Sequence, residues 1–427
     1  MRSSFDIRQT LLGFFEQRDH LLLPSSSLIP DDPSLLLTTA GMVQLLPYFT
    51  GERTPPGPRL TTAQRCVRTV DVDNIGKTDR HTTYFEMFGN FSFGDYDGPQ
   101  AVAWAWELFT EQLGIDKDRL WITVYLDDDD TVEIWRSLGV PPERIQRLGM
   151  EENYWSVGRP GPCGPCTEIF YDRGPSYGPD GGPAVDTDRF LELGNVVLMR
   201  HVRGEGGTDD DFPVVGDLPR PGIDVGLGLE RIAMALQESK HIHEIDSFRP
   251  SLDHLVGLSR VNDLESVRVV VDHLHATAML VADGVLPSAG GRGHVMRRLI
   301  RRALGRLRRL DLPSKTLTDL IPSVLDGRVP LRPELVDVRP IVESVLTAES
   351  EAFDRALRQG SRLLRRAIRR TLERSETVLP GESAFELYDA CGMPLELTIE
   401  LAHESGLTVD VERFEELMAK HRERSGG

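Results

Sequence analysis

The hydrophobic pattern of the chain changes once, near residue 250, and this change constrains the fold more than any single motif. Before it, strand-like segments such as 120–126 (LWITVYL) and 193–199 (LGNVVLM) alternate with helix-like ones such as 99–114. After it the pattern is almost purely helical, with 266–273 (SVRVVVDH) as a possible strand. A chain of 427 residues is too long for one ordinary core. We therefore expect two domains, an α+β domain over 1–245 and an all-helical domain over 246–427.

The remaining global features are typical of a cytoplasmic protein. We find no apolar run long enough to span a membrane and no signal peptide, and the apolar residues of 1–15 recur instead at helical spacing: Ile7, Leu11, Phe14 and Phe15. Two polar, glycine-rich stretches, 173–188 and 203–222, predict surface loops. Four cysteines at uneven intervals form no disulfide framework, which favours a reducing compartment.

One pair of cysteines has metal-like spacing. Cys163 and Cys166 lie in 161–172 (GPCGPCTEIFYD) with the spacing of half a zinc knuckle, but a zinc site needs a second pair. The other two cysteines, Cys66 and Cys391, are isolated. We therefore expect no structural zinc, and interpret the segment as a rigid Gly-Pro loop that delivers Thr167 and Glu168 to a site, or as a plain structural turn.

Residues 64–96 predict a strand, a polar loop and a second strand that is dense in aromatic residues. Arg68 follows the first strand, Arg80 and His81 close the loop, and Tyr84 and Phe85 begin the second strand. Arginine binds phosphate through two parallel hydrogen bonds, and an aromatic face can stack on a purine. The segment is thus a candidate nucleotide site, although an ordinary antiparallel hairpin with a charged loop fits it as well.

Residues 222–234 (GIDVGLGLERIAM) predict the point where a strand becomes a helix. Gly226 and Gly228 permit a close approach to the backbone, and a buried Asp224 would be costly unless it met a cation such as an ammonium group. Arg231 in the first helical turn opposes the helix dipole by about 0.3–1 kcal/mol, which suits a residue that meets an anion. A surface arginine at the start of a helix is the alternative.

These stretches resemble the motifs of class II aminoacyl-tRNA synthetases, and specifically those of the alanyl-tRNA synthetase family. Residues 25–49 resemble the first motif, 65–96 the second and 222–233 the third, while 153–172 resemble a cysteine-containing loop of the family. Similarity continues through 281–304 and 381–398. The resemblance implies a class II antiparallel sheet flanked by helices, followed by a helical domain that recognises tRNA.

The resemblance also implies a reaction, in which ATP and Mg²⁺ convert L-alanine to alanyl-AMP and the alanyl group passes to an acceptor. The carboxylate of alanine attacks the α-phosphate of ATP directly, so the reaction needs positioned arginines rather than a general base. The implied catalytic residues are Arg68 at the α-phosphate and Arg231 at adenine and the terminal phosphates. The other residues implied by the resemblance are Arg80, His81, Tyr84 and Phe85 for ATP, the last two as a stacking face, and Trp155, Asn195, Asp224 and Gly226 for alanine, with Asp224 on the ammonium group.

The sequence departs from the family in several places. It ends at MAKHRERSGG, where family members continue into an editing domain and a further domain, so we expect a truncated form or a paralogue. At the positions that resemble acceptor-stem readers, Ala289 stands where the family has Asn, and Glu396 where it has Asp. Near the active site, Gly194 replaces a Trp, but on a strand it should face away from Asn195.

Arginine is concentrated in two segments of a chain whose net charge is −18 and which has only five lysines. In 292–310, the residues Arg297, Arg298, Arg301 and Arg302 form one helical stripe, which in the family lies along the acceptor stem. The stripe could equally be a solvated face. The second cluster, 355–374, holds eight arginines and could contact nucleic acid or an acidic partner.

Three functions fit these observations. The first is activation of alanine and charging of tRNA(Ala). The second is an alanyl-tRNA synthetase-like paralogue that passes alanine to a non-tRNA acceptor, such as a small molecule of specialised metabolism or a carrier. The third is a non-catalytic tRNA-binding or regulatory module, which the intact Arg68, Asp224 and Arg231 disfavour.

Overall fold

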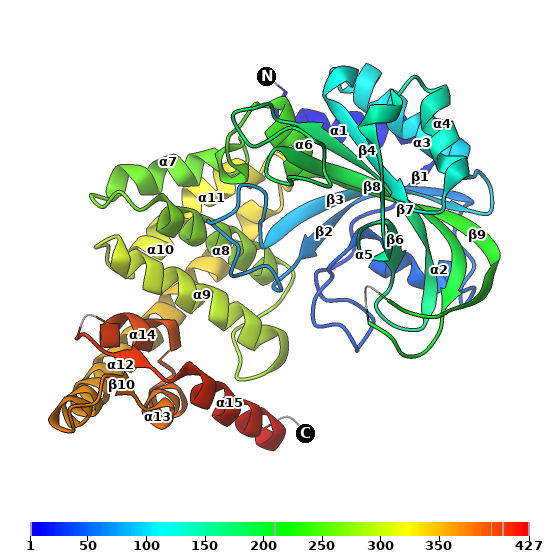
Figure 1. Ribbon diagram of the computed structural model, residues 1–427. Helices are drawn as coiled ribbons and strands as arrows, with labels where there is room; N and C mark the ends of the chain where they lie inside the picture. The colour runs from blue at the N-terminus through cyan, green and yellow to red at the C-terminus, as the bar shows by residue number, and fades with distance from the viewer. Residues whose placement is uncertain (1, 209–210, 394, 404, 426–427) are drawn as a thin grey trace. The chain divides into compact units, whose positions relative to one another are not determined.

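A computed structural model describes residues 2–208, 211–393, 395–403 and 405–425 and divides them into two compact units (Figure 1). The first unit runs to residue 252 and also takes in 326–333, and the second comprises 253–325 and the chain from 334 onward. The expected division at residue 245 falls seven residues before the end of the first unit's opening segment. It takes no account of 326–333, which return to the first unit.

A nine-stranded, largely antiparallel sheet forms the centre of the first unit, as the α+β prediction required. Its strand order is β1-β2-β3-β9-β8-β7-β4-β5, with β6 paired to β7, and only the β1–β2 and β4–β5 pairs are parallel. The strands are β1 (Leu21–Leu22), β2 (Arg59–Val67), β3 (Tyr84–Phe93), β4 (Leu120–Tyr125), β5 (Ile145–Leu148), β6 (Tyr154–Ser156), β7 (Gly161–Asp172), β8 (Phe190–Arg203) and β9 (Val214–Gly228).

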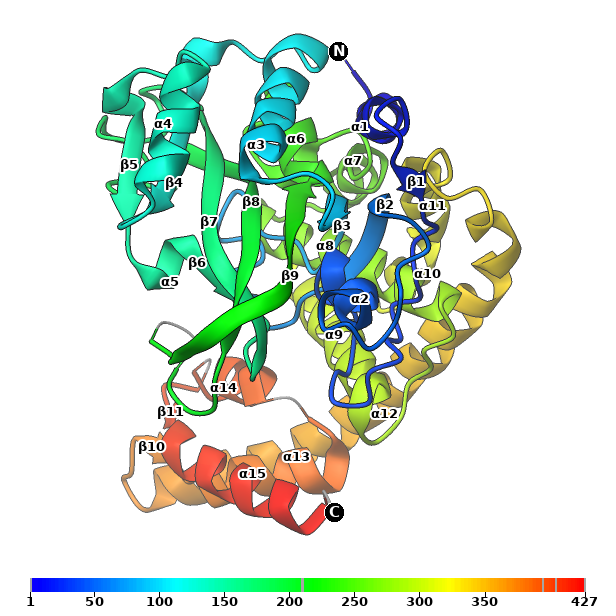
Figure 2. The same cartoon turned by 90° about the vertical axis from the view of Figure 1, so that its right-hand side faces the viewer.

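Alternation along the strands gives the sheet two different faces. Helices cover one face (Figure 2). On that face the ring of Phe88 in β3 lies 5.6 Å from that of Phe15 in α1. Phe91, three residues on, points to the opposite face and packs with Phe49. The covering helices are α1 (Ser4–Glu16), α3 (Gly98–Glu107), α4 (Asp129–Ser137) and α6 (Leu229–Leu236); the opposite face carries η1 (Gly41–Leu45), α2 (Leu46–Phe49) and α5 (Met150–Asn153).

Several local predictions can be compared with these elements. The helix predicted over the first fifteen residues is confirmed as α1, in which Ile7, Leu11, Phe14 and Phe15 are all buried. The Gly-Pro loop predicted at 161–172 is wrong, because the segment is strand β7. The loop predicted at 203–222 is also wrong in part, since β9 begins at Val214. In both cases glycine and proline occur within long strands of an antiparallel sheet, where bulges in the pairing accommodate them.

A buried ion pair fixes residues 326–333 in the first unit. Nη1 of Arg328 lies 3.1 Å from Oε1 of Glu230 in α6, and both side chains are almost completely buried. The guanidinium group also lies over the rings of Tyr84 and Phe248, at 5.1 and 4.5 Å from their centroids. Burial raises the pKa of Glu230, although Arg328 opposes this effect. The segment thus supplies the oppositely charged partner of a buried carboxylate whose Oε2 also accepts a hydrogen bond of 3.0 Å from the backbone N–H of Glu86.

The second unit is helical, apart from one short parallel pair of strands, β10 (Val378–Leu379) and β11 (Thr408–Val409). The pair corrects the all-helical prediction, and the strand considered at 266–273 is instead helical and buried on most sides. No helix in the described part of the chain is long and apolar enough to cross a membrane. The helices after the sheet are α7 (Arg249–Leu258), α8 (Leu264–Ala282), α9 (Gly291–Arg309), α10 (Thr316–Asp319), α11 (Ile321–Arg328), α12 (Leu335–Glu373), α13 (Gly381–Cys391), α14 (Leu395–His403) and α15 (Val411–Ser425).

Candidate active site

A row of residues crosses the face of the sheet opposite α1. Gly89 of β3 pairs with Gly226 of β9, Gly226 with Asn195 of β8, and Asn195 with Glu168 of β7. Directly paired residues of antiparallel strands point to the same face. The ring of Phe91 fills the space over Gly89, where a Cβ atom would lie 2.4 Å from its Cζ, so the row places a side-chain-free position at Gly226 beside an amide and a carboxyl. A Cβ atom at Gly226 would lie 3.3 Å from Sδ of Met87 and 3.4 Å from Oδ1 of Asn195, so a side chain at this position would crowd both groups.

Asp224 lies two residues before Gly226 and therefore on the same face. It pairs with Phe91 and Val197, so apolar side chains surround its carboxyl group. Burial raises its pKa to about 7, and no hydrogen bond or ion pair reaches it within the described residues. A buried carboxyl without a partner is costly, and a cation of the right size would relieve that cost.

A cavity of about 580 Å³ opens over this face, and three expected residues line it: Arg68, Trp155 and Asn195. Glu168 and Thr39 line it as well, whereas Asp224, Gly226, Phe85 and Arg231 lie outside its lining. Gly194 does not widen the cavity, because a Cβ atom there would meet the carbonyl oxygen of Gly226 at 2.3 Å.

Arg68 lies at the end of β2, where its Nε donates a hydrogen bond of 2.9 Å to the carbonyl oxygen of Thr39. Its guanidinium carbon lies 5.1 Å from the ring centroid of Phe85. The backbone contact uses one donor, so the remaining donors can face the cavity that Arg68 lines. Phe85 is half-buried, and the guanidinium group of Arg68 covers one face of its ring.

Tyr84 requires a correction. Successive residues of β3 point to opposite faces, so Tyr84 lies on the helix-covered face while Phe85 lies on the open one. Its side chain is almost completely buried and packs against Arg328. The expectation that Tyr84 forms a stacking face for adenine is therefore wrong for this structure. Of Tyr84 and Phe85, only Phe85 lies on the open face of the sheet.

Arg231, in the first turn of α6, is held by a carboxylate. Its Nη1 lies 2.6 Å from Oε2 of Glu192 in β8 and also donates to the carbonyl oxygen of that residue. Burial alone would raise the pKa of Glu192, but Arg231, with Arg68 and Arg80, outweighs it and lowers the pKa. An ionised Glu192 thus stands among three of the arginines expected at the nucleotide.

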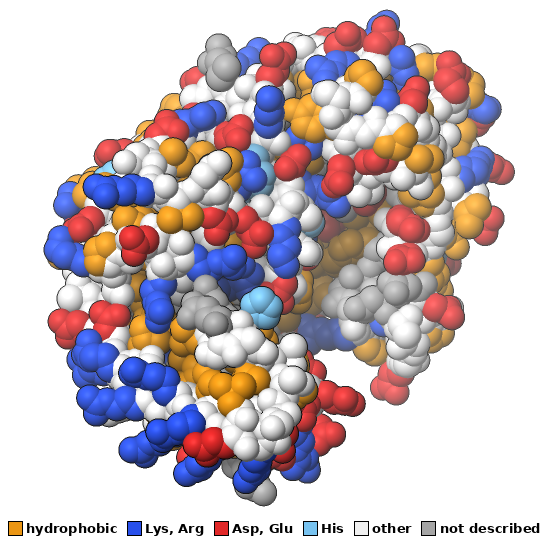
Figure 3. Space-filling model, turned by 60° about the vertical axis from the view of Figure 1, so that its left-hand side comes forward, with side chains coloured by type: hydrophobic (Ala, Val, Ile, Leu, Met, Phe, Trp, Pro, Cys, Tyr) orange, Lys and Arg blue, Asp and Glu red, His pale blue; other side chains and the backbone are white. Residues whose placement is uncertain are grey.

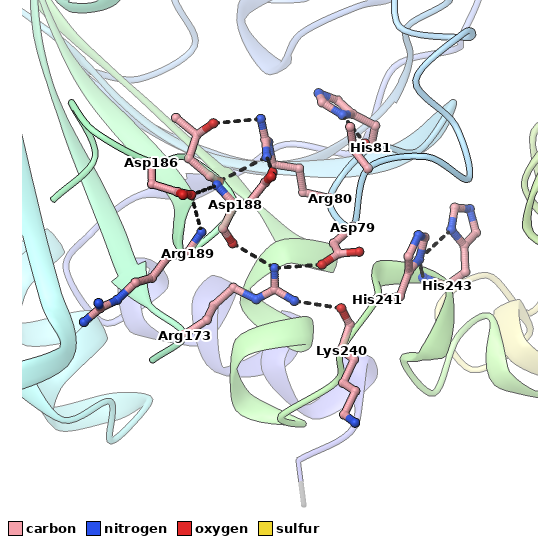
Figure 4. Close-up of polar contacts among 12 residues, drawn as sticks. Asp79, Arg80, His81, Arg173, Asp186, Asp188, Arg189, Lys240, His241 and His243 are labelled. Carbon is pink, nitrogen blue, oxygen red and sulfur yellow. Dashed lines mark hydrogen bonds and ion pairs between the residues drawn. The ribbon is translucent and has the colours of Figure 1, made fainter. Parts of the chain in front are cut away.

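Arg80 and His81 belong to the loop between β2 and β3 (Figure 4). Their charges interact with this group, since Arg80 lowers the pKa of Glu192 and Arg231 lowers that of His81. Arg80 donates to Oδ1 of Asp188 at 2.8 Å and to the carbonyl oxygen of Thr187, which fixes it to the loop before β8. Burial and then the charge of Arg231 lower the pKa of His81, so its imidazole is neutral at pH 7. Thr78 Oγ1 is 2.6 Å from its Nδ1.

The two residues expected from 161–172 have different surroundings. Glu168 faces the cavity, and burial followed by the charge of Glu192 raises its pKa well above the usual range. Thr167 points to the other face, where it accepts a hydrogen bond from Trp135 and donates one to the carbonyl oxygen of Thr123. Cys163 and Cys166 are buried in separate hydrophobic clusters, and no group of three or more His, Cys, Asp or Glu side chains among the described residues could hold a metal ion.

In the second unit, the expected acceptor-binding residues line one groove of about 1430 Å³, formed mainly by α9, α12, α13 and α14. Its lining includes Ala289, Arg297, Arg298, Arg301 and Arg302. Arg297 and Arg301 of α9 both pair with Glu349 of α12, at 3.3 and 2.7 Å. The positive charge of the α9 arginines is therefore partly neutralised within the unit. The side chain of Glu396 lies outside the described residues, although its backbone is in α14.

Comparison with known protein families gives a match that covers almost the whole chain. The family described as "tRNA synthetases class II (A)" matches residues 6–426 of the chain. The chain belongs to this family. The resemblance of the motifs is therefore confirmed over nearly the whole length, and the antiparallel sheet with flanking helices is the sheet of a class II synthetase.

Alanine--tRNA ligases are similar to this class II chain over almost its whole length. That of Streptomyces avermitilis is 48% identical over 435 residues, covering 99% of this chain and 49% of the relative. That of Thermobifida fusca is 48% identical over 433 residues, covering 98% and 49%. The chain thus spans about half the length of the curated relatives it matches. A solved histidyl-tRNA synthetase of S. aureus aligns with 55% of this chain and 66% of its own, at 14% identity and a TM-score of 0.35.

Sequence reasoning missed Glu192, the carboxylate that positions Arg231 in this class II site. Its partner lies 39 residues away along the chain, and no short motif joins the two. One signal was available in the sequence: Glu192 lies between Leu191 and Leu193 in an otherwise apolar, strand-like segment. A charged residue in such a strand needs a partner of opposite charge.

Proposed function

We propose that the protein activates L-alanine with ATP, forming alanyl-AMP and pyrophosphate, and transfers the alanyl group to an acceptor, with tRNA(Ala) as the first candidate. The observation that carries this proposal is the isolated carboxyl of Asp224, buried on the same face as Asn195 and Gly226. A primary ammonium group would supply the missing partner, and the absence of a side chain at Gly226 keeps the amide of Asn195 uncrowded.

Arginines at two points support the nucleotide half of the proposal. Arg68 lines the cavity and would stabilise the charge that develops on the α-phosphate as the alanine carboxylate attacks it. Arg231, steadied by Glu192, would hold the other end of ATP, with the neutral His81 and Arg80 beside it. Phe85 offers the remaining aromatic surface on this face.

A magnesium ion fits the same group of residues. Glu192 is an ionised carboxylate among the arginines and is the side chain that would contact an ion carried by the phosphates. The ion would neutralise phosphate charge and orient the pyrophosphate leaving group. Burial and then the charge of Glu192 raise the pKa of Glu168, which favours its protonated form, and that form could donate a hydrogen bond toward the cavity.

A non-tRNA acceptor is the second candidate, and a specific observation favours it. Ala289 is exposed at the groove of the second unit and has no side-chain donor or acceptor where the family has an amide. The alanyl group could then pass to a small molecule or a carrier. A double change, Ala289→Asn with Glu396→Asp, separates the candidates: it raises charging of tRNA(Ala) only if that tRNA is a weakened natural acceptor.

The test of activation is ATP–pyrophosphate exchange with each of the twenty amino acids. We expect exchange with alanine in the unmodified protein and its loss in Asp224→Ala. Asp217→Ala is the matched control, because Asp217 lies on the same strand with 88% of its side chain exposed. Exchange that persists in Asp224→Ala, or that no amino acid supports in the unmodified protein, would refute the proposal.

A further inference from the structure

One surface of the second unit has no part in the functions proposed above. It is the C-terminal half of helix α12, where seven arginines lie on the helix and an eighth, Arg374, caps its end. At 100° per residue, the seven fall within an arc of about 140°, directly opposite the buried Phe353 and Leu364. We call this set the arginine stripe: Arg355, Arg358, Arg362, Arg365, Arg366, Arg369 and Arg370.

The arginine stripe is exposed, and few acidic side chains offset its positive charge. All seven side chains are exposed, and Figure 3 shows Lys and Arg side chains gathered over the second unit. Arg355 is the one member with an ion pair in the described structure, a loose contact of 3.7 Å with Glu351. No acidic residue occurs between 355 and 370, so arginines one turn apart, such as Arg362 and Arg366, repel each other. Helix α15 is different, since its Arg413 pairs with Glu416 at 2.7 Å.

The spacing of the charges matches that of a nucleic-acid strand. From Arg355 to Arg370 the helix rises about 22 Å, at 1.5 Å per residue. Seven charges over that length give one for every 3–4 Å or so, which is of the same order as the one phosphate per about 3.4 Å of axis in a strand of duplex DNA. Guanidinium groups also bind phosphate oxygens in pairs, which lysine cannot do.

The composition of the arginine stripe favours a phosphate backbone over an acidic protein. Between 355 and 370, the one other residue within the arc is Gln359, so the surface has no apolar or aromatic anchor. Protein interfaces normally have such anchors at their centre. Contacts to phosphates need only regularly placed positive donors.

The arginine stripe is continuous with the groove described above. Arg355, its first member, lines that groove together with Arg297, Arg298 and Arg302 of α9. Burial and the charges of Arg297, Arg298 and Arg301 also lower the pKa of His294, as a strongly positive groove requires. The positive surface therefore runs from the groove along α12 for several helical turns.

We propose that the arginine stripe binds the phosphate backbone of duplex RNA, as a second contact surface beyond the groove. The proposal extends the proposed function, since a tRNA arm is the duplex that such an enzyme would meet. Pyrophosphate exchange tests the function and RNA binding tests the arginine stripe, so the two can fail separately.

The experiment measures binding of a fluorescein-labelled RNA hairpin to the full chain by anisotropy, between about 50 and 200 mM salt. The variant replaces Arg358, Arg362, Arg366 and Arg369 with Gln, which keeps the helix-forming tendency and leaves Arg355 at the groove unchanged. We expect affinity to fall at least tenfold and the slope of log K against log salt to drop by about 2–4. Pyrophosphate exchange should not change.

A matched control makes the same change in net charge at exposed arginines elsewhere, as Arg53→Gln, Arg136→Gln, Arg147→Gln and Arg260→Gln. Binding with the affinity and salt slope of the unmodified protein is expected for this control. Equal losses in both variants would mean that net charge alone sets binding, which overturns the proposal. It is also overturned if the stripe variant binds RNA normally, or if the unmodified protein binds labelled poly-L-glutamate and not the RNA hairpin.

Discussion

Replacing Asp224 with Asn should stabilise the unliganded protein at high pH while it removes activity. The folded protein holds the proton on this carboxyl up to about pH 7, whereas the unfolded chain releases it near the ordinary value of 3.8. Folding therefore takes up a proton between these pH values, and stability falls as the pH rises through that window. Asn carries no charge at any pH and escapes this cost.

The magnitude follows from the shift in pKa. A difference of about three pH units, at 1.36 kcal/mol per unit, corresponds to about 4 kcal/mol at pH 8. pH 5 is little more than one unit above the pKa of this carboxyl in the unfolded chain, so the loss of folding stability there is about 1.7 kcal/mol. The advantage of Asp224→Asn over the unmodified protein should therefore grow by about 2–3 kcal/mol from pH 5 to pH 8. For a unit of this size that is a relative rise in melting temperature of roughly 5–10 °C.

Thermal melts of both proteins at pH 5 and pH 8, without ligand, measure this difference. Asp217→Asn serves as the control, since an exposed carboxyl should show no such dependence on pH. Added alanine should stabilise the unmodified protein and not Asp224→Asn, because only the carboxylate attracts the ammonium group. An advantage that is equal at both pH values would refute the reasoning, since it would mean that Asp224 is not held in a buried, uncompensated state.

Three further predictions concern packing and the glycine beside Asn195. Gly164→Ala should destabilise the protein by about 2–4 kcal/mol in denaturant titrations, because its Cβ atom would lie 1.8 Å from a carbonyl oxygen of β8; Gly13→Ala, with nothing within 4 Å, should be neutral or slightly stabilising. Arg328→Met should lower the free energy of unfolding by about 3–5 kcal/mol, because it leaves the carboxylate of Glu230 buried without its cation. The double change Arg328→Met with Glu230→Gln should lower it by less, and equal losses in the two variants would contradict a buried ion pair. Gly226→Ala should raise the KM for alanine in pyrophosphate exchange and leave that for ATP unchanged, and a change confined to ATP would count against the proposed pocket.

Local patterns were enough to predict the parts of the site that lie close together in the sequence. The strand that ends before Arg68 and the helix that begins before Arg231 follow from periodicity, as does the burial of Asp224 on a strand. The predicted strands at 120–126 and 193–199 correspond to β4 and β8. In each case neighbouring residues carry both the signal and the structure.

Features that depend on pairing between distant strands could not be predicted. The orientation of Tyr84 depends on which face α1 covers, and alternation alone does not say which face that is. The contact between Arg231 and Glu192 needs the register of β8 against β9. Segment 161–172 misled because glycine and proline usually mark loops, and only its position in the middle of the sheet, between β4 and β8, turns it into a strand.

The return of residues 326–333 to the first unit has a consequence for how that unit is made. During synthesis, Glu230 leaves the ribosome almost a hundred residues before Arg328, and in that interval its side chain lacks the oppositely charged partner it has in the finished fold. The N-terminal unit is therefore an assembly whose last piece arrives late. A fragment that stops near residue 252 would lack this piece and should fold poorly, whereas the same fragment supplied with a peptide covering 326–333 should regain part of its stability.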